Sequence, residues 1–184
     1  PVVQQIESIE KQIEIIMKVL LKNDQQILIL MPNSDSGSSL ITNVIKKYQI
    51  QEKIQIITHA PRVDFLSLVS NAEVFVGNSS SGIHETNTFD IPTINIGTRQ
   101  AGRLRSENII DTGYNKEEII TTINQCFDDA TFISRCNSVI NPYGVGDAGK
   151  KIAEILSLTD FTEQKILRKE MTIKGEINPE GWFR

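Results

Sequence analysis

Residues 73–96 read EVFVGNSSSGIHETNTFDIPTINI, and this stretch decides the fold class. The pattern predicts a strand over 73–76, a glycine- and serine-rich loop over 77–82, a helix over 81–89 and a second strand over 92–96. A strand, a helix and a strand in so short a segment indicate a right-handed crossover between two parallel strands.

The same alternation continues in both directions from this unit. Apolar residues at helical spacing predict further helices, over residues up to 21, 38–48, 63–70, 116–127 and 146–156. Short apolar runs predict further strands, over residues 26–31, 54–58 and 109–110. The run 26–31 is almost continuously apolar, which is typical of a strand covered on both faces. We therefore expect an α/β fold with one doubly wound, Rossmann-like parallel sheet over residues 1–158.

The last part of the chain, residues 159–184, differs from the rest. Residues 161–171 (FTEQKILRKEM) predict a helix, and a polar tail follows. This segment is either a ragged terminus or a piece that docks on another domain.

Composition narrows the function classes. The chain has 184 residues, 39% of them hydrophobic and 23% charged, which is an ordinary globular balance. Because its formal net charge is -4, we expect the chain to bind neither nucleic acid nor a membrane surface. Cys126 and Cys136 make neither a disulfide scaffold nor a four-cysteine zinc site, and they fit a reducing, cytoplasmic setting. Because the sequence opens at Pro1, we expect it to be part of a longer protein.

Ligands of open parallel sheets bind at the carboxyl ends of the strands. The strongest signal at such a place is Gly77-Asn78-Ser79-Ser80-Ser81-Gly82, which follows one strand and precedes a helix. Successive main-chain N–H groups and three hydroxyls would form a phosphate cradle, although the loop lacks the lysine of a Walker motif. The alternative is an ordinary Ser/Gly turn that caps a helix.

Glu85 follows this loop in the first helical turn. Its carboxylate either accepts hydrogen bonds from two sugar hydroxyls or simply complements the amides of the helix start.

The loop at residues 97–105 places three arginines within seven residues of an otherwise acidic chain. Guanidinium groups suit a diphosphate, so Arg99 is a candidate ligand. The alternative is a solvated loop with ion pairs to Glu107 or Asp111, and this alternative is stronger for Arg103 and Arg105.

The remaining polar candidates are weaker. His59 and His84 are the only histidines, and histidines of this kind are usually loop or surface residues. Asn33, Asp35 and Ser36 either contact a ligand or form an Asx turn. No residue spacing suggests a catalytic triad, a metal site or a cofactor.

Residues 77–110 carry a family resemblance. GNSSSGIHE, PTINIG, RQAGR and ENI occur in the order and near the spacing seen in the C-terminal domain of UDP-N-acetylglucosamine 2-epimerases of the hydrolysing branch. The Asp-Ser-Gly-Gly and Thr-Glu-Arg-Pro segments typical of the non-hydrolysing branch are absent from the sequence. Supporting matches are PNSDSGS, THAP and NPYGVGDA, at residues 32–38, 58–61 and 141–148.

This resemblance implies one half of a two-domain enzyme of the glycosyltransferase-B type, with residues 1–158 as the UDP-binding domain. It implies that the serine loop and Arg99 hold the diphosphate, that Glu85 holds the ribose, that His59 and Ala60 face uracil and that Asn33 lines the cleft. The implied substrate-binding set is Asn33, His59, Ala60, Asn78, Ser79, Ser80, Ser81, Gly82, Glu85 and Arg99. The roles of Gln100 and Arg103, which also match the family pattern, stay open.

The chain departs from the family pattern at two places. His84 stands where most relatives have arginine, so no catalytic role is carried onto it. The family's domain opens with His-Pro-Val-Thr, whereas this sequence starts at Pro1, after the position of that histidine. Catalytic acids and bases are expected in the N-terminal domain, which is a further partner of this chain.

The implied reaction of the full-length enzyme is loss of UDP from UDP-N-acetylglucosamine across C1–C2, followed by addition of water to the glycal to give N-acetylmannosamine, for sialic or related nonulosonic acids. The substrate is alternatively a 4-acetamido-6-deoxy relative. We expect the isolated chain to bind UDP without turnover, to need no cofactor or metal, and to form a homo-oligomer when full length. Rival functions are a glycosyltransferase-B type sugar-nucleotide transferase and a non-catalytic nucleotide-sugar-binding module.

Overall fold

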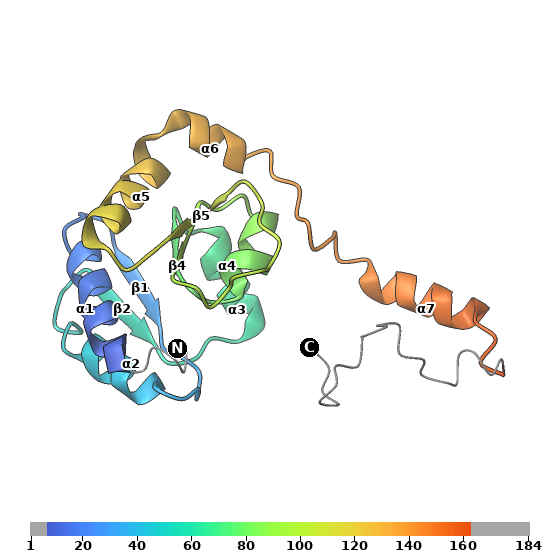
Figure 1. Cartoon of the computed structure of the whole chain (residues 1–184), viewed down its shortest axis with the longest axis horizontal. Coiled ribbons are helices and arrows are strands. Elements are labelled where there is room, and N and C mark those ends of the chain that lie inside the picture. The colour runs from blue at the N-terminus through green and yellow to red at the C-terminus, as the bar shows by residue number, and fades with distance from the viewer. Residues whose placement is uncertain (1–6, 163–184) are drawn as a thin grey trace, which may run out of the picture. The chain divides into compact units, whose positions relative to one another are not determined.

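The computed structural model describes residues 7–162 and divides the chain into two compact units, residues 1–143 and 144–184. The first unit alternates helices and strands along the chain (Figure 1). Its elements are α1 (Ile9–Leu20), β1 (Ile27–Leu30), α2 (Ser38–Lys46), β2 (Ile54–Ile57), α3 (Arg62–Ser70), β3 (Phe75–Gly77), α4 (Ser81–His84), the 3-10 helix η2 (Thr86–Thr88), β4 (Thr93–Ile96), β5 (Ile109–Thr112), α5 (Lys116–Asp128) and α6 (Ala130–Cys136). The second unit contains α7 (Ala148–Leu158).

All strand pairs are parallel, which confirms the predicted α/β class. β1 pairs with β2, and β3, β4 and β5 form a second ladder in that order. No hydrogen-bonded ladder joins the two groups within residues 7–162. Every residue of the central strand β4 is buried, as expected for a strand with neighbours on both sides.

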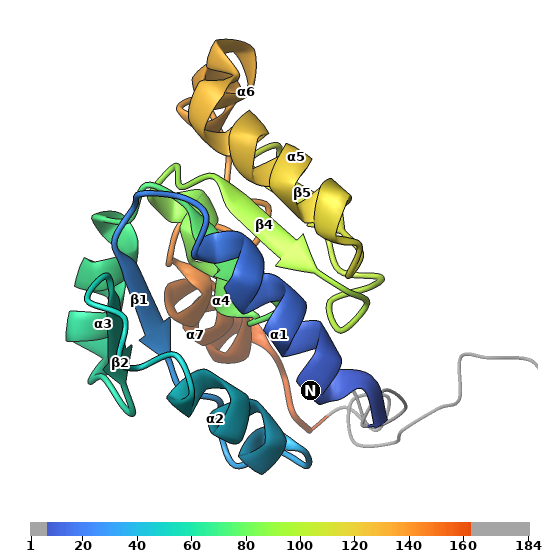
Figure 2. The same cartoon turned by 90° about the vertical axis from the view of Figure 1, so that its left-hand side faces the viewer.

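The core lies on one face of β4. Ile94 and Ile96 point to this face and pack with side chains of α1, α5 and α6. Thr93 lies on the opposite face, because successive side chains alternate along a strand. There it meets α4, where a Cβ on Gly82 would lie 3.2 Å from the Thr93 methyl group. Figure 2 shows α1 and α5 alongside β4.

Two helices start at side-chain caps. The carboxamide of Asn115 accepts the N–H groups of Glu117 and Glu118 at 2.9 and 3.1 Å, which begins α5. Asp129 caps α6 in the same way. The sequence patterns missed α6, because no glycine or proline separates it from α5.

Three expectations on local structure were wrong. β1 is not covered on both faces, since Leu28 and Leu30 are 38% and 39% exposed. A short apolar run signals burial but not the number of faces covered. The helix expected over 81–89 is instead α4 followed by η2, and β3 begins at Phe75 rather than Glu73.

The predicted helix over 146–156 is confirmed as α7, which lies in the second unit. Its apolar residues Ile152, Ile155 and Leu156 are exposed. The domain boundary after residue 158 stays a prediction, and the helix expected over 161–171 lies almost entirely outside the described residues. No helix in the described part of the chain is long and apolar enough to cross a bilayer.

The two thiols belong to the core. Cys126 and Cys136 are both buried and unpaired, and burial raises the pKa of both, that of Cys126 to about 12. Because the thiolate is the reactive species, we expect neither cysteine to react with Ellman's reagent at pH 8 in the native chain within minutes. Unfolding in urea should release both thiols. Rapid labelling of either thiol without urea would contradict the buried placement.

Candidate functional site

The loops that leave the carboxyl ends of the strands approach one another at one edge of the first unit. The Arg99 guanidinium, after β4, lies 3.9 Å from the Asp35 carboxylate, after β1. Arg62, after β2, lies 3.4 Å from Glu85, which follows the loop after β3. These contacts join loops from four strands, so the structure brings the predicted candidate region together.

The serine loop, residues 77–82, presents free main-chain donors. The N–H groups of Ser79 and Ser80 make no hydrogen bond with any described residue. By contrast, the N–H of Ser81 lies 3.3 Å from the Ser79 hydroxyl, and that of Gly82 donates to the Ser79 carbonyl at 3.2 Å. Two adjacent amides are therefore available to an anion at this bend, and two are already used within the loop.

The helix that follows the serine loop is short. α4 has only four residues, so its macrodipole is small and the individual amides are the relevant donors. Gly82 is buried here, and a Cβ on it would lie 3.0 Å from the ring of Phe75. Its role in the structure is close packing of α4 on β3.

One arginine of the loop at residues 97–105, hereafter the arginine loop, reaches the serine loop. Arg99 donates from Nη1 to the carbonyl of Asn78 at 3.1 Å, and its side chain is 36% exposed. Glu85, with a side chain 22% exposed, follows the serine loop in the chain, and within residues 7–162 its one ion-pair partner is Arg62. A partly exposed guanidinium thus contacts the start of the serine loop, and a carboxylate follows its end in the chain.

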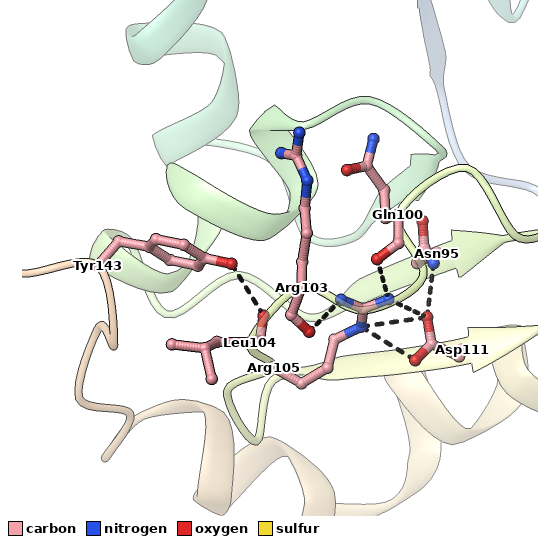
Figure 3. Close-up of polar contacts among 7 residues, drawn as sticks. All are labelled: Asn95, Gln100, Arg103, Leu104, Arg105, Asp111 and Tyr143. Carbon is pink, nitrogen blue, oxygen red and sulfur yellow. Dashed lines mark hydrogen bonds and ion pairs between the residues drawn. The ribbon is translucent and has the colours of Figure 1, made fainter. Parts of the chain in front are cut away.

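Arg105 is engaged inside the arginine loop (Figure 3). Its Nε donates to Asp111 at 3.0 Å, and its terminal nitrogens donate to the carbonyls of Arg103 and Gln100 at 2.9 and 2.8 Å. Asp111 also accepts from Asn95 at 2.5 Å. The ion pair to Asp111 confirms the structural interpretation of Arg105, which braces the loop.

Arg103 is directed to α4 instead. It donates from Nη1 to Nε2 of His84 at 2.8 Å. A guanidinium only donates, so this imidazole nitrogen accepts and the ring proton lies on Nδ1. The His84 ring lies 4.1 Å from that of Tyr143, whose hydroxyl donates to the Leu104 carbonyl at 3.2 Å. His84 therefore holds the arginine loop against α4.

The other predicted residues lie in the loops after β1 and β2. Asn33 is exposed, and its carbonyl accepts the N–H of Asp35 at 2.8 Å. His59 is exposed and Ala60 is half-buried. The side chains of Asn33 and His59 make no hydrogen bond within the described chain, so their roles stay predictions.

The sequence patterns do not single out Arg62 as a site residue, and they leave the role of Gln100 open. Arg62 is the residue after the THAP segment and the first residue of α3. Its place beside that segment is the one sequence feature that indicates a site residue here. Gln100 is 1% exposed and donates to the Asn78 carbonyl at 2.7 Å. No local sequence pattern indicates a contact between residues 22 positions apart.

A shallow depression of about 670 Å³ is lined by the start of the arginine loop, the end of β5 and the first turns of α5. None of the predicted ligand-binding residues lines it. Its carboxylates, Asp111, Glu117 and Glu118, would repel a phosphate, which favours the serine loop as the anion site.

The fold is that of one half of a glycosyltransferase-B type protein. The chain aligns with a UDP-N-acetylglucosamine 2-epimerase from Methanocaldococcus jannaschii in complex with UDP-GlcNAc and UDP, at a TM-score of 0.66 and 24% identity. The alignment covers 85% of this chain and 43% of that one. A structure from Listeria monocytogenes gives a TM-score of 0.65 at 16% identity, with coverage of 85% and 43%.

Sequence comparison identifies the family. The profile of the UDP-N-acetylglucosamine 2-epimerases matches residues 2–157, and the chain belongs to this family. It is 34% identical to the UDP-N,N'-diacetylbacillosamine 2-epimerase (hydrolyzing) of Legionella pneumophila, over 92% of this chain and 43% of that protein. It is 31% identical to polysialic acid biosynthesis protein P7 of Escherichia coli, over 86% and 40%. The predicted resemblance to the hydrolysing branch is confirmed.

The chain spans about two fifths of the length of these two relatives, 43% and 40%.

Proposed function

We propose that this chain is the UDP-binding half of a hydrolysing UDP-N-acetylglucosamine 2-epimerase. The observation that carries the proposal is the pair of main-chain donors at Ser79 and Ser80 that have no hydrogen-bond partner within residues 7–162, with the Arg99 guanidinium bonded to the adjacent Asn78 carbonyl. Adjacent amides and a guanidinium are the groups that bind a diphosphate.

The same groups have a role in the reaction. Loss of UDP across C1–C2 of the sugar transfers negative charge to the leaving diphosphate. The main-chain donors of the serine loop and the Arg99 guanidinium stabilise that charge as it develops. Removal of the C2 proton and addition of water to the glycal need acid–base groups. We place these groups in the N-terminal domain, so the chain alone binds UDP and does not turn over the sugar nucleotide.

The sugar is N-acetylglucosamine or its diacetamido relative. The diacetamido sugar is supported by the names of the Legionella protein and of a Campylobacter jejuni GDP/UDP-N,N'-diacetylbacillosamine 2-epimerase (hydrolyzing), which is 36% identical over 62% of this chain and 31% of that protein. Both sugars carry an N-acetyl group at C2, so the elimination chemistry is shared.

The test uses the full-length protein with each UDP-sugar. We expect free UDP and a free 2-epimeric sugar in equal amounts, with water as the only co-substrate. Transfer of the sugar to an added acceptor would instead support a transferase. Failure of the 184-residue chain to bind UDP at millimolar concentration would contradict the assignment of the nucleotide site.

Glu85 provides a test of the ribose contact. A carboxylate that accepts two hydroxyl hydrogen bonds contributes about 1.5–3 kcal/mol, so Glu85→Ala should weaken UDP binding by about 10- to 100-fold. Binding of 2′,3′-dideoxy-UDP should change by less than about threefold, since that ligand lacks both hydroxyls. Arg62→Ala is the matched control, because it removes the ion-pair partner of Glu85 and leaves the carboxylate. Equal losses for both ligands would show that Glu85 does not bind the ribose. Calorimetric titration measures these affinities.

A further inference from the structure

Gln100 has an unusual environment for an amide side chain. It is 1% exposed, and its Nε2 donates to the main-chain carbonyl of Asn78 at 2.7 Å. Its Oε1 is buried and has no partner among the described residues. Burial of an unpaired amide oxygen costs free energy. The hydrogen bond that Nε2 donates to the Asn78 carbonyl is therefore the feature that explains why a glutamine occupies this position.

The contact connects two loops that leave neighbouring strands. Gln100 belongs to the arginine loop after β4, and Asn78 to the serine loop after β3. The main-chain carbonyl of Gln100 is held in turn by Arg105 at 2.8 Å, and Arg105 is anchored on Asp111 (Figure 3). The side-chain amide that donates to Asn78 therefore belongs to a segment whose main chain is held by Arg105.

The contact also orients one peptide plane. The described peptide bonds are trans, so the C=O of Asn78 and the N–H of Ser79 point in opposite directions from the same plane. Gln100 and Arg99 both donate to that carbonyl, at 2.7 and 3.1 Å. The Ser79 N–H is thereby turned away from these two donors, and it has no partner within the described chain.

We propose that Gln100 is a positioning residue, which holds the Asn78–Ser79 peptide so that its N–H, and not its carbonyl oxygen, faces the diphosphate. Rotation of this peptide by half a turn would present a negative oxygen to the anion. Arg99, with a side chain 36% exposed, is accessible to a ligand, whereas Gln100 is buried and contacts only the protein. The inference rests on the proposed function for the identity of the ligand, but the orientation of the peptide is testable without it.

The first experiment uses the 184-residue chain and Gln100→Met, which keeps the length of the side chain and removes the donor. We expect UDP to bind about tenfold more weakly and uridine, which has no phosphate, to bind within about twofold of wild type. Equal losses for UDP and uridine, or no loss for either, would overturn the positioning role.

Gln100→Glu tests the donor itself. A protonated carboxyl can donate to the Asn78 carbonyl, whereas an ionised carboxylate repels it, and burial raises the pKa of such a group. The ratio of UDP affinities, Gln100→Glu to wild type, should approach one near pH 5 and fall about tenfold or more by pH 8. A ratio independent of pH would overturn the inference, because lost packing does not titrate.

A measurement without ligand separates this inference from the nucleotide assignment. The Ser79 amide resonance should broaden by exchange in Gln100→Met and stay sharp in wild type. If wild type shows no affinity for UDP, the proposed function fails, while the amide resonance still decides whether Gln100 fixes the peptide. A sharp Ser79 resonance in both proteins would overturn the inference.

Discussion

Replacing Ser80 with proline is expected to weaken UDP binding by about 10- to 100-fold and to leave the fold intact. Proline removes the N–H group, which makes no hydrogen bond within the described chain. The φ of Ser80 is -62°, which matches the angle fixed by the proline ring. The loss corresponds to one hydrogen bond to a charged ligand, about 1.5–3 kcal/mol.

Ser80→Ala is the matched control, because it keeps the N–H and removes only the hydroxyl. We expect a smaller loss for alanine, at most about fivefold, if the main chain is the principal donor. Calorimetric titration with UDP measures both variants, and thermal melting checks that Ser80→Pro is folded. Equal affinities of the two variants would show that the Ser80 amide does not contact the diphosphate.

Gly97→Ala is expected to destabilise the chain by about 2–4 kcal/mol, or roughly 5–15 °C in melting temperature. Gly97 has φ +82°, a conformation unfavourable for residues with a Cβ. An added Cβ would also overlap Tyr114, because it would lie 2.7 Å from Cζ of that ring and against its hydroxyl oxygen. Tyr114 is packed against the core cluster, so its ring has little room to move.

Gly102→Ala separates the cost of the backbone conformation from the cost of overlap with Tyr114. Gly102 lies in the same loop with nearly the same backbone angle, φ +79°, but nothing lies within 4 Å of a Cβ placed there. We expect it to cost only the backbone term, about 1–2 kcal/mol. Chemical denaturation of both variants measures the difference. Equal losses at the two positions would mean that Tyr114 accommodates the methyl group without cost.

The arginine loop is held at both ends. Gly97 permits the turn that leaves β4, and Arg105 closes the loop on Asp111. Arg99 and Gln100 lie between these fixed points, and both donate to Asn78. A variant that loosens either end should therefore weaken anion binding without a change in any ligand-contacting side chain.

The sequence alone predicted the α/β class, the order of most elements and the family. These properties depend on the period of apolar residues and on glycine and serine at a turn, which are local signals. Local patterns also explain the errors. The helix expected over 81–89 breaks into two short helices at Glu85, and α6 follows α5 with only Asp129 between them. Neither boundary contains a glycine or proline, and the start of α6 is marked by the Asp129 cap.

For the candidate site, the sequence indicated the serine loop, Glu85 and Arg99. Their polar or charged groups can bind a nucleotide, and they follow predicted strands. Tertiary structure alone decided that Arg105 is held by Asp111 and that the Ser79 and Ser80 amides have no partner in the described part of the chain. It alone placed the Gln100 amide against Asn78. The physical reason is that parallel pairing of β3 with β4 brings together loops about 20 residues apart, and hydrogen bonds across that gap have no periodicity in the sequence.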